Sequence, residues 1–245
     1  MRIGVLALQD DVSPARWVTD RIHTFGENVA SLVPEGFEAH ARVFHPTSTT
    51  GAERSVSWAE IATANGREAH AEMQFPNLTG QWPHRDRQKE SFWNHEPNEG
   101  SLPRDIAVLL GTLLAPITTT PDRCWFCVWD GFGGAKLPYQ NPHKVELPHR
   151  FYHLLQGPIE GINESFLGPW GNNAIWQSAN LWWPDDRAWF VATEIDLMST
   201  YVGGTRASID ALLNTSELEV LEAQPTHGIG LQSDRINPTP MEPYR

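Results

Sequence analysis

Apolar and polar positions alternate in several parts of the chain, and this alternation predicts strands. From Phe37 to Phe44 every second residue is apolar, which leaves His40 and Arg42 on the other face of a strand. Arg123 to Trp129 and Arg187 to Asp196 are apolar on both faces, which is typical of central strands. The other expected strands are Leu147 to Leu155 and, at a sheet edge, Leu218 to Ala223.

Helical spacing predicts four helices between these strands. They cover Pro14 to Leu32, Ser57 to Asn65, Ser101 to Leu114 and Thr205 to Leu213. Ser57 and Glu60 have the spacing of a capping box. In this motif the Ser side chain accepts a hydrogen bond from the Glu backbone N–H, and the Glu side chain accepts one from the Ser backbone N–H. Ser101 is expected to cap the third helix and Pro116 to stop it.

Two segments without a sustained period, Gln74 to Gly100 and Gly161 to Asn180, are interpreted as long loops. The proline-rich tail over residues 225–245 is expected to be extended. Strands interrupted irregularly by helices and long loops are typical of the α+β class. The sequence therefore predicts one α+β domain over residues 1–245, with a mostly antiparallel central sheet, flanking helices and long loops.

Composition and charge narrow the classes of function. The chain has 18 Lys and Arg against 30 Asp and Glu, a net charge of −12, and no basic run, so nucleic acid is not expected as a partner. Its longest apolar run, Ile106 to Ile117, is shorter than the roughly 18 residues that a membrane span needs. Cys124 and Cys127, the only cysteines, should lie on opposite faces of their strand, which favours buried packing and a cytoplasmic location.

The strongest candidate for chemistry is a pair of carboxylates, Glu194 and Asp196, on one face at a strand end. Two carboxylates so close repel each other when both are ionised, which raises the pKa of one of them unless a cation intervenes. One of them could then act as a general base. The alternative is that Arg187 or another arginine pairs with both, so that the cluster only ties elements together.

Residues near this pair are candidates for substrate binding. Arg187 and Arg42 could hold an anionic group, and Gly203-Gly204 before the helix at Thr205 could present backbone N–H groups to it. The simpler interpretation of the glycines is a turn followed by Thr205 as an ordinary N-cap. The remaining candidates in this run are Ser199, Thr200 and Tyr201.

Two further polar residues end predicted strands, His45 and Asp130, and a histidine beside a carboxylate is a common acid–base pair. Both also fit ordinary turns, His45-Pro46 and Asp130-Gly131. His149 and His153 would lie roughly 13 Å apart along a strand, too far to share a metal. No metal and no organic cofactor is therefore expected.

Several segments resemble a family of uncharacterised actinobacterial proteins. The clearest is LWWPDDRAWFVATEIDLMSTYVGG, Leu181 to Gly204, and CWFCVWDGFG, Cys124 to Gly133, also matches the pattern. The resemblance covers nearly the whole chain but implies no established activity. It also suggests a weaker similarity to proteins of specialised metabolism that close an aziridine ring in azinomycin-type biosynthesis.

These observations lead to two hypotheses about function. The first is a cofactor-independent enzyme of specialised metabolism that acts on a polar anionic small molecule, for example by intramolecular amine displacement of a sulfate or phosphate, as in aziridine formation. The second is a non-catalytic interaction, immunity or regulatory protein that uses an acidic surface and exposed tryptophans. The sequence leaves open whether the chain forms a homo- or hetero-oligomer.

Overall fold

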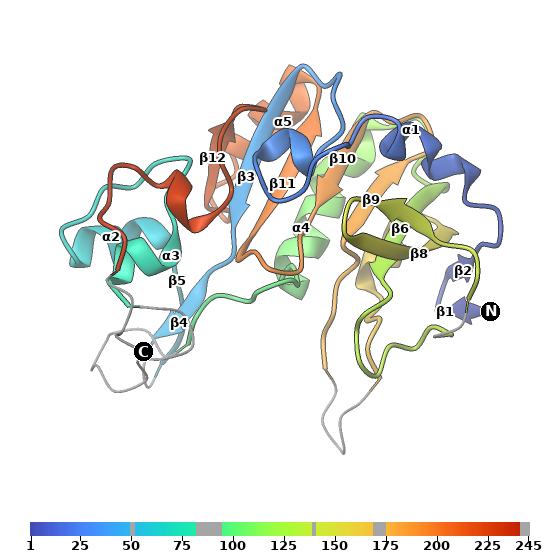
Figure 1. Ribbon diagram of the computed structural model, residues 1–245, viewed down its shortest axis with the longest axis horizontal. Helices are drawn as coiled ribbons and strands as arrows, with labels where there is room; N and C mark the ends of the chain where they lie inside the picture. Colours follow the sequence, from blue (N-terminus) through green and yellow to red (C-terminus); the bar gives the residue numbers. More distant parts are fainter. Residues whose placement is uncertain (50–51, 82–94, 139–140, 169–174, 241–245) are drawn as a thin grey trace.

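A computed structural model of the chain describes residues 1–49, 52–81, 95–138, 141–168 and 175–240. Its centre is one large sheet in which every strand pairing is antiparallel (Figure 1). From one edge to the other the strands are β1 (Arg2–Ile3), β2 (Leu6–Leu8), β8 (Arg150–Gly157), β6 (Cys124–Trp129), β9 (Leu181–Pro184), β10 (Trp189–Ala192), β11 (Ser199–Gly204), β3 (Ala39–Phe44) and β12 (Val220–Ala223). β7 (Val145–Leu147) pairs with β8, and β4 (Thr47–Thr49) forms a separate ribbon with β5 (Ala52–Val56).

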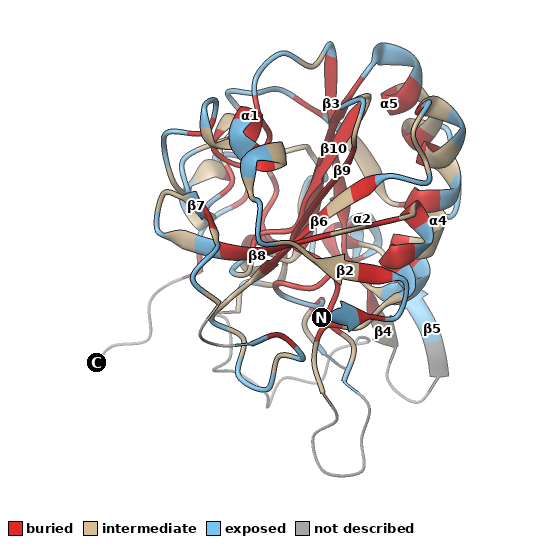
Figure 2. Cartoon of the chain, turned by 90° about the vertical axis from the view of Figure 1, so that its right-hand side faces the viewer, coloured by how far each residue is buried: buried red, intermediate tan, exposed pale blue. Residues whose placement is uncertain are grey.

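Helices cover both faces of this sheet. Seen nearly edge-on in Figure 2, α4 (Arg104–Leu114) and α5 (Arg206–Leu213) lie on one side and α1 (Arg16–Thr19) lies on the other. We call these sides the α4 face and the α1 face. The short helices α2 (Trp58–Ala64) and α3 (Phe75–Thr79) lie beyond β3 and β12 (Figure 1). The predicted α+β class with a mostly antiparallel sheet and flanking helices is confirmed.

Strand β3 shows why the central strands are buried on both sides. Ala39, Ala41 and Val43 belong to the apolar core under the α4 face, as the alternation predicts. Its other side chains, His40 and Arg42, point to the α1 face and are also buried. Polar side chains at such positions need hydrogen-bond partners inside the protein, because water does not reach them.

Local sequence signals are confirmed where they depend on nearby residues. Ser57 and Glu60 form the predicted capping box at the start of α2. Thr205 caps α5, with its side chain accepting a hydrogen bond from the Ser208 N–H. Cys124 and Cys127 are buried thiols in the cores of opposite faces, and burial raises the pKa of Cys124 to about 12. Neither cysteine is therefore ionised near neutral pH.

The predicted helix over Pro14 to Leu32 is wrong. Only Arg16–Thr19 is α-helical, Gly26 has a φ of +70°, and Asn28 caps a separate 3-10 turn, Val29–Ser31. The apolar side chains of the segment are buried against the α1 face of the sheet all the same. An irregular segment that packs on a sheet can therefore have apolar residues at the spacing of a helix.

Two other expected elements differ in the structure, and two strands were not expected. Leu147 to Leu155 is not one strand but the hairpin β7–β8, which turns at Pro148 and His149, the latter with a φ of +58°. The segment expected to be a loop after Gln74 contains α3, Phe75–Thr79. In the described chain β9 and β11 are strands that the sequence pattern did not indicate.

Helix α4 begins later than expected. Pro103 stands at its N-cap, and Ser101 instead accepts a hydrogen bond from the Ser178 N–H through its hydroxyl. The tail up to residue 240 is not extended, because it forms a 3-10 turn, Leu231–Ser233, and then buries Asp234. Residues 241–245 of the tail lie outside the described residues. Among the helices that the structure describes, none has the length and apolarity of a membrane span.

Candidate functional site

The sequence-predicted site residues do not lie in one place. Five of them are enclosed around β3 and β11, with Arg42, Ser199 and Tyr201 on the α1 face and His45 and Thr200 on the α4 face; two lie beside a pocket on the α1 face, and four lie in strands or turns elsewhere. The enclosed cluster is Arg42, His45, Ser199, Thr200 and Tyr201. The pair beside the pocket is Glu194 and Asp196.

Arg42 is a structural residue inside the enclosed cluster. Its guanidinium donates hydrogen bonds to Ser199 Oγ at 2.9 Å and to the carbonyl oxygens of Ala71 and Met73 at 2.9 and 2.8 Å. It also packs over the rings of Phe44 and Tyr201, 4.6 and 5.6 Å from their centroids. Because only 2% of Arg42 is exposed, a substrate anion has no access to it. The prediction that Arg42 binds substrate is not supported by this geometry.

His45 and Thr200 form a hydrogen-bonded chain on the α4 face. His45 Nδ1 lies 2.6 Å from the Asn98 carbonyl, which can only accept, so Nδ1 carries the proton. Nε2 then accepts from Thr200 Oγ1 at 2.8 Å, and Thr200 accepts from Thr193 Oγ1 at 2.7 Å. Burial lowers the pKa of His45 to about 4. The ring is therefore neutral at pH 7, with both nitrogens used, and holds three segments together.

The glycine pair does not form an anion-binding turn. Gly203 and Gly204 are residues of β11, paired with β3 and β10. A Cβ at Gly203 would come within 2.6 Å of Val33 on the α1 face, and one at Gly204 within 2.3 Å of Ser208 Oγ on the α4 face. The glycines allow close packing of both layers on the strand, and their N–H groups are not available to a ligand.

Asp130 and Arg187 also lie away from the pocket. Asp130 accepts a hydrogen bond from Lys144 Nζ at 2.8 Å, and this ion pair is on the α4 side of β8 near His153. Arg187 is exposed in the turn between β9 and β10, with its guanidinium 5.1 Å from the Trp17 ring centroid. It precedes β10 whereas Glu194 follows it, so the two are on the order of 20 Å apart.

Glu194 and Asp196 do have a cation between them, Arg150 at the start of β8. Arg150 Nε donates to Glu194 Oε1 at 2.7 Å and its Nη2 donates to Asp196 Oδ2 at 2.7 Å. The second oxygen of Glu194 accepts from the Asp196 N–H at 2.6 Å. We call these three residues the open cluster. The alternative in which an arginine pairs with both carboxylates is therefore correct, but the arginine is not Arg187.

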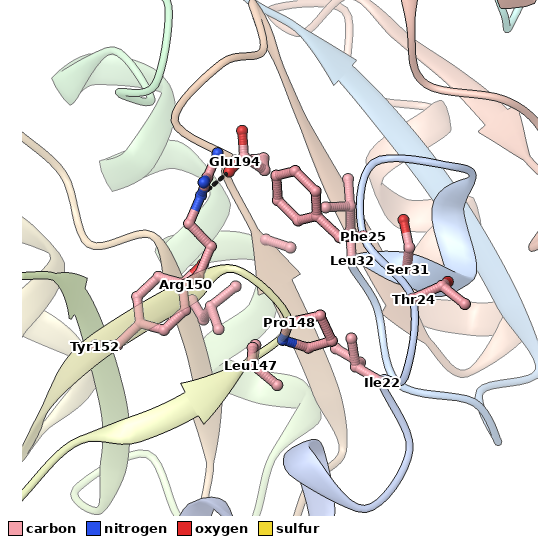
Figure 3. Close-up of a pocket in the computed structure, with 12 residues that line it drawn as sticks. Ile22, Thr24, Phe25, Ser31, Leu32, Leu147, Pro148, Arg150, Tyr152 and Glu194 are labelled. Atoms are coloured by element: carbon pink, nitrogen blue, oxygen red, sulfur yellow. Dashed lines mark hydrogen bonds and ion pairs between the residues drawn. The ribbon is translucent and has the colours of Figure 1, made fainter. Parts of the chain in front are cut away.

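A pocket opens beside the open cluster on the α1 face (Figure 3). The cavity itself has a volume of about 20 Å³, room for about one water molecule, and the empty space with the open mouth included is about 350 Å³, so a ligand would occupy mainly the mouth. Its apolar lining comes from the segment after α1 and from the β7–β8 hairpin, which approach it from opposite sides (Figure 3). The apolar side chains include Ile22, Phe25, Leu32, Leu147, Pro148 and Leu181, and the polar ones are Thr24, Ser31, Arg150, Tyr152 and Glu194.

Tyr152 gives the pocket a hydroxyl whose hydrogen-bonding capacity is unused. Its phenol makes no hydrogen bond to a residue that the structure describes, although only 4% of Tyr152 is exposed. Burial, reinforced by the charge of Glu194, raises the pKa of Tyr152 far above its usual range, so the hydroxyl keeps its proton. It can therefore donate one hydrogen bond to a ligand and accept another.

Sequence reasoning missed Arg150, Tyr152 and Phe25. Arg150 is held between two carboxylates and Phe25, whose ring centroid is 4.5 Å from the guanidinium carbon. Burial alone would lower the pKa of Arg150, but the hydrogen bond to Glu194 and the charges of both carboxylates outweigh burial and raise it. The only local signal was an arginine between apolar residues in LPHRFYHLL. Nothing in that segment indicated a partner 44 residues later.

Comparison with known proteins adds no assignment to this geometry: no protein-family model, curated protein or solved structure matches the chain. The resemblance to an actinobacterial family stays a prediction. The site is accordingly defined by its own residues, an ion-paired arginine and an unpartnered phenol at the polar end of an apolar pocket.

Proposed function

We propose that this protein binds a compact, largely apolar small molecule in the pocket between Phe25 and the β7–β8 hairpin. The observation that carries the proposal is the lining itself: apolar walls with a few convergent polar groups, Arg150, Glu194 and Tyr152, at one end. Pockets of this composition are the usual sites for small ligands, because the walls supply affinity and the polar groups fix orientation.

The arrangement favours the binding and orientation of a ligand. Glu194 and Asp196 each accept a hydrogen bond from Arg150, and Glu194 accepts a second one from the Asp196 N–H. These bonds fix the carboxylates in place beside the pocket. Glu194 is therefore well suited to hold and orient a polar group of the ligand.

The two sequence-based hypotheses differ in how well the geometry supports them. An enzyme that holds a sulfate or phosphate with Arg42 and Arg187 has little support, because neither arginine lines the pocket. Amine displacement chemistry stays a prediction. The interaction-protein hypothesis also stays a prediction: the tryptophans that the structure describes are buried or half-buried, and Trp82, Trp93 and Trp170 lie outside the described residues. The cytoplasmic location remains part of our proposal, supported by the two buried thiols.

A blocked pocket provides the test. Thr24 is exposed at the pocket lining, so Thr24→Trp should fill the opening without disturbing the core. Thr112→Trp is the matched control, since Thr112 is exposed on α4, on the opposite face of the sheet. Fragments that bind the wild type in ligand-observed NMR should lose binding to Thr24→Trp and keep it with Thr112→Trp. If both variants bind the same fragments as the wild type, the pocket is not the binding site.

A further inference from the structure

We propose that the ligand of this pocket is a cation, namely a compact amine with an apolar or aromatic body. This inference rests on the proposed function and gives its ligand a charge. The open cluster has one positive group, Arg150, and two negative groups, Glu194 and Asp196, so its net charge is −1. A charge that moves from water into a partly buried site is stabilised by an opposite charge there, because burial removes part of its hydration.

The unused hydrogen-bond acceptors of the open cluster also favour a cation. Each oxygen of Glu194 accepts one hydrogen bond within the cluster, and a carboxylate oxygen has two lone pairs. Asp196 Oδ1 makes no hydrogen bond with any residue that the structure describes, and 70% of the Asp196 side chain is exposed at the rim. An ammonium group, which has three donors and no acceptor, fits these unused acceptors.

An anion could use the remaining N–H groups of Arg150, but its surroundings oppose it. All three guanidinium nitrogens already donate, to Glu194, to Asp196 and to the His149 carbonyl. An anion at the remaining N–H groups would lie beside two carboxylates, and such like-charge contacts are unfavourable. The electrostatic environment of Tyr152, in the pocket wall, also favours a cation. There Glu194 raises the pKa of the phenol by more than Arg150 lowers it.

The pocket walls define the rest of the ligand. Leu32, Leu147 and Leu181 provide apolar contacts, and Phe25 provides an aromatic ring. Arg150 occupies one position over that ring, 4.5 Å from its centroid, so the ligand's ammonium must bind on the Glu194 side, away from the guanidinium. Tyr152 also lines the pocket, and its hydroxyl can accept a second hydrogen bond from the amine.

Three probes with the same body separate charge from shape: 2-phenylethylamine as the cation, 2-phenylethanol as the neutral form and 3-phenylpropionate as the anion. We expect the amine to bind most tightly and the acid least tightly in calorimetric or NMR titrations of the full chain at low salt. The amine should exceed the alcohol by about fivefold, and the ratio should shrink in concentrated salt, because a surface-accessible charge pair is screened.

Asp196→Asn tests the source of this preference. Since the Asp196 side chain is mostly exposed, the fold should tolerate the change, while the cluster becomes neutral. The amine should lose about fivefold in affinity and the alcohol should be unaffected. Asp122→Asn is the matched control: it removes one exposed carboxylate just before β6, at the other end of that strand from Trp129, which packs near Arg150. It should leave all three affinities unchanged.

The outcomes separate this inference from the proposed function. If the acid binds most tightly, or if the three probes bind equally, the ligand is not selected as a cation, although a probe lost in Thr24→Trp still marks the pocket as a binding site. If Asp196→Asn and Asp122→Asn weaken the amine to the same extent, overall charge and not the open cluster explains the preference. If Thr24→Trp retains every probe, or no probe binds, both proposals fail together.

Discussion

The enclosed cluster and the open cluster each contain an arginine, which is buried in the first and half-buried in the second, and the two arginines differ in their access to a ligand. Arg42 is 2% exposed and donates to a hydroxyl and two backbone carbonyls, with aromatic rings around it. Arg150 has a side chain that is 13% exposed, donates to two carboxylates and borders a pocket. The comparison shows that a candidate binding residue is recognised by access and by unused hydrogen-bonding capacity, and not by its charge.

The position of each arginine in the sheet explains the difference. Arg42 is in the interior of β3, where β11 and β12 pair on either side and the chain covers both faces. Arg150 is the first residue of β8, directly after the hairpin turn at His149. The end of a strand beside a turn leaves room for solvent or a ligand, whereas the middle of a central strand does not.

The largest loss of stability should follow from replacing Arg42. Arg42→Met leaves the carbonyls of Ala71 and Met73 without donors in a dry interior, so we expect a loss of about 4 kcal/mol in the free energy of unfolding. Arg150→Met should cost about half as much, because water from the pocket can reach Glu194. Urea denaturation of both variants measures the difference. Equal losses would mean that the two sites are equally closed.

The second largest effect should be a loss of stability of the protein on acidification, caused by His45 in the enclosed cluster. Burial lowers the pKa of His45 from 6.5 to about 4, so the unfolded chain takes up the proton first as the pH falls. The stabilisation is complete above about pH 6.5 and is lost between that value and about pH 4; it amounts to about 3 kcal/mol. His153, whose pKa is also lowered to about 4 by burial, should contribute in the same direction.

Two substitutions separate these histidines in the same denaturation series. His45→Gln should lower stability at pH 7 by about 2 kcal/mol, because Thr200 and Asn98 lose their partner. His153→Leu should cost little, since Nδ1 of His153 has no hydrogen-bond partner in the described structure. Each should reduce the dependence of stability on pH between 6.5 and 4. An unchanged pH profile in His45→Gln would assign the effect to other groups.

A smaller effect should follow from Gly100→Ala, which acts on the turn that carries the open cluster. Gly100 has a φ of +70°, and a Cβ there would meet the Ile195 carbonyl oxygen at 2.4 Å. We expect a loss of about 2 kcal/mol together with weaker ligand binding, because Ile195 lies between Glu194 and Asp196. Gly133→Ala is the control, with no atom within 4 Å of the added Cβ. Unaltered binding by Gly100→Ala would show that the turn does not position the carboxylates.

Much of the fold could be predicted from local patterns, but the site could be predicted only in part. The strands around Arg42 and Cys124 and the capping box at Ser57 follow from spacing between neighbouring residues. The irregular segment before Leu32 and the hairpin at His149 depend on packing against distant strands. The pattern placed Glu194 beside Asp196 but gave no sign of Arg150, because a strand pattern shows which residues share a face and not which other strand lies beside them.

The order of strands in the sheet has a consequence for synthesis on the ribosome. Strand β3 lies between β11 and the edge strand β12, and the hydrogen bond from Arg42 to Ser199 in β11 joins residues 157 positions apart. Until β11 has been made, β3 has neither of its neighbours, because β12 comes later still. Contacts over such separations form slowly. The nascent chain must therefore keep its earliest central strand unpaired, and protected from aggregation, until translation is nearly complete.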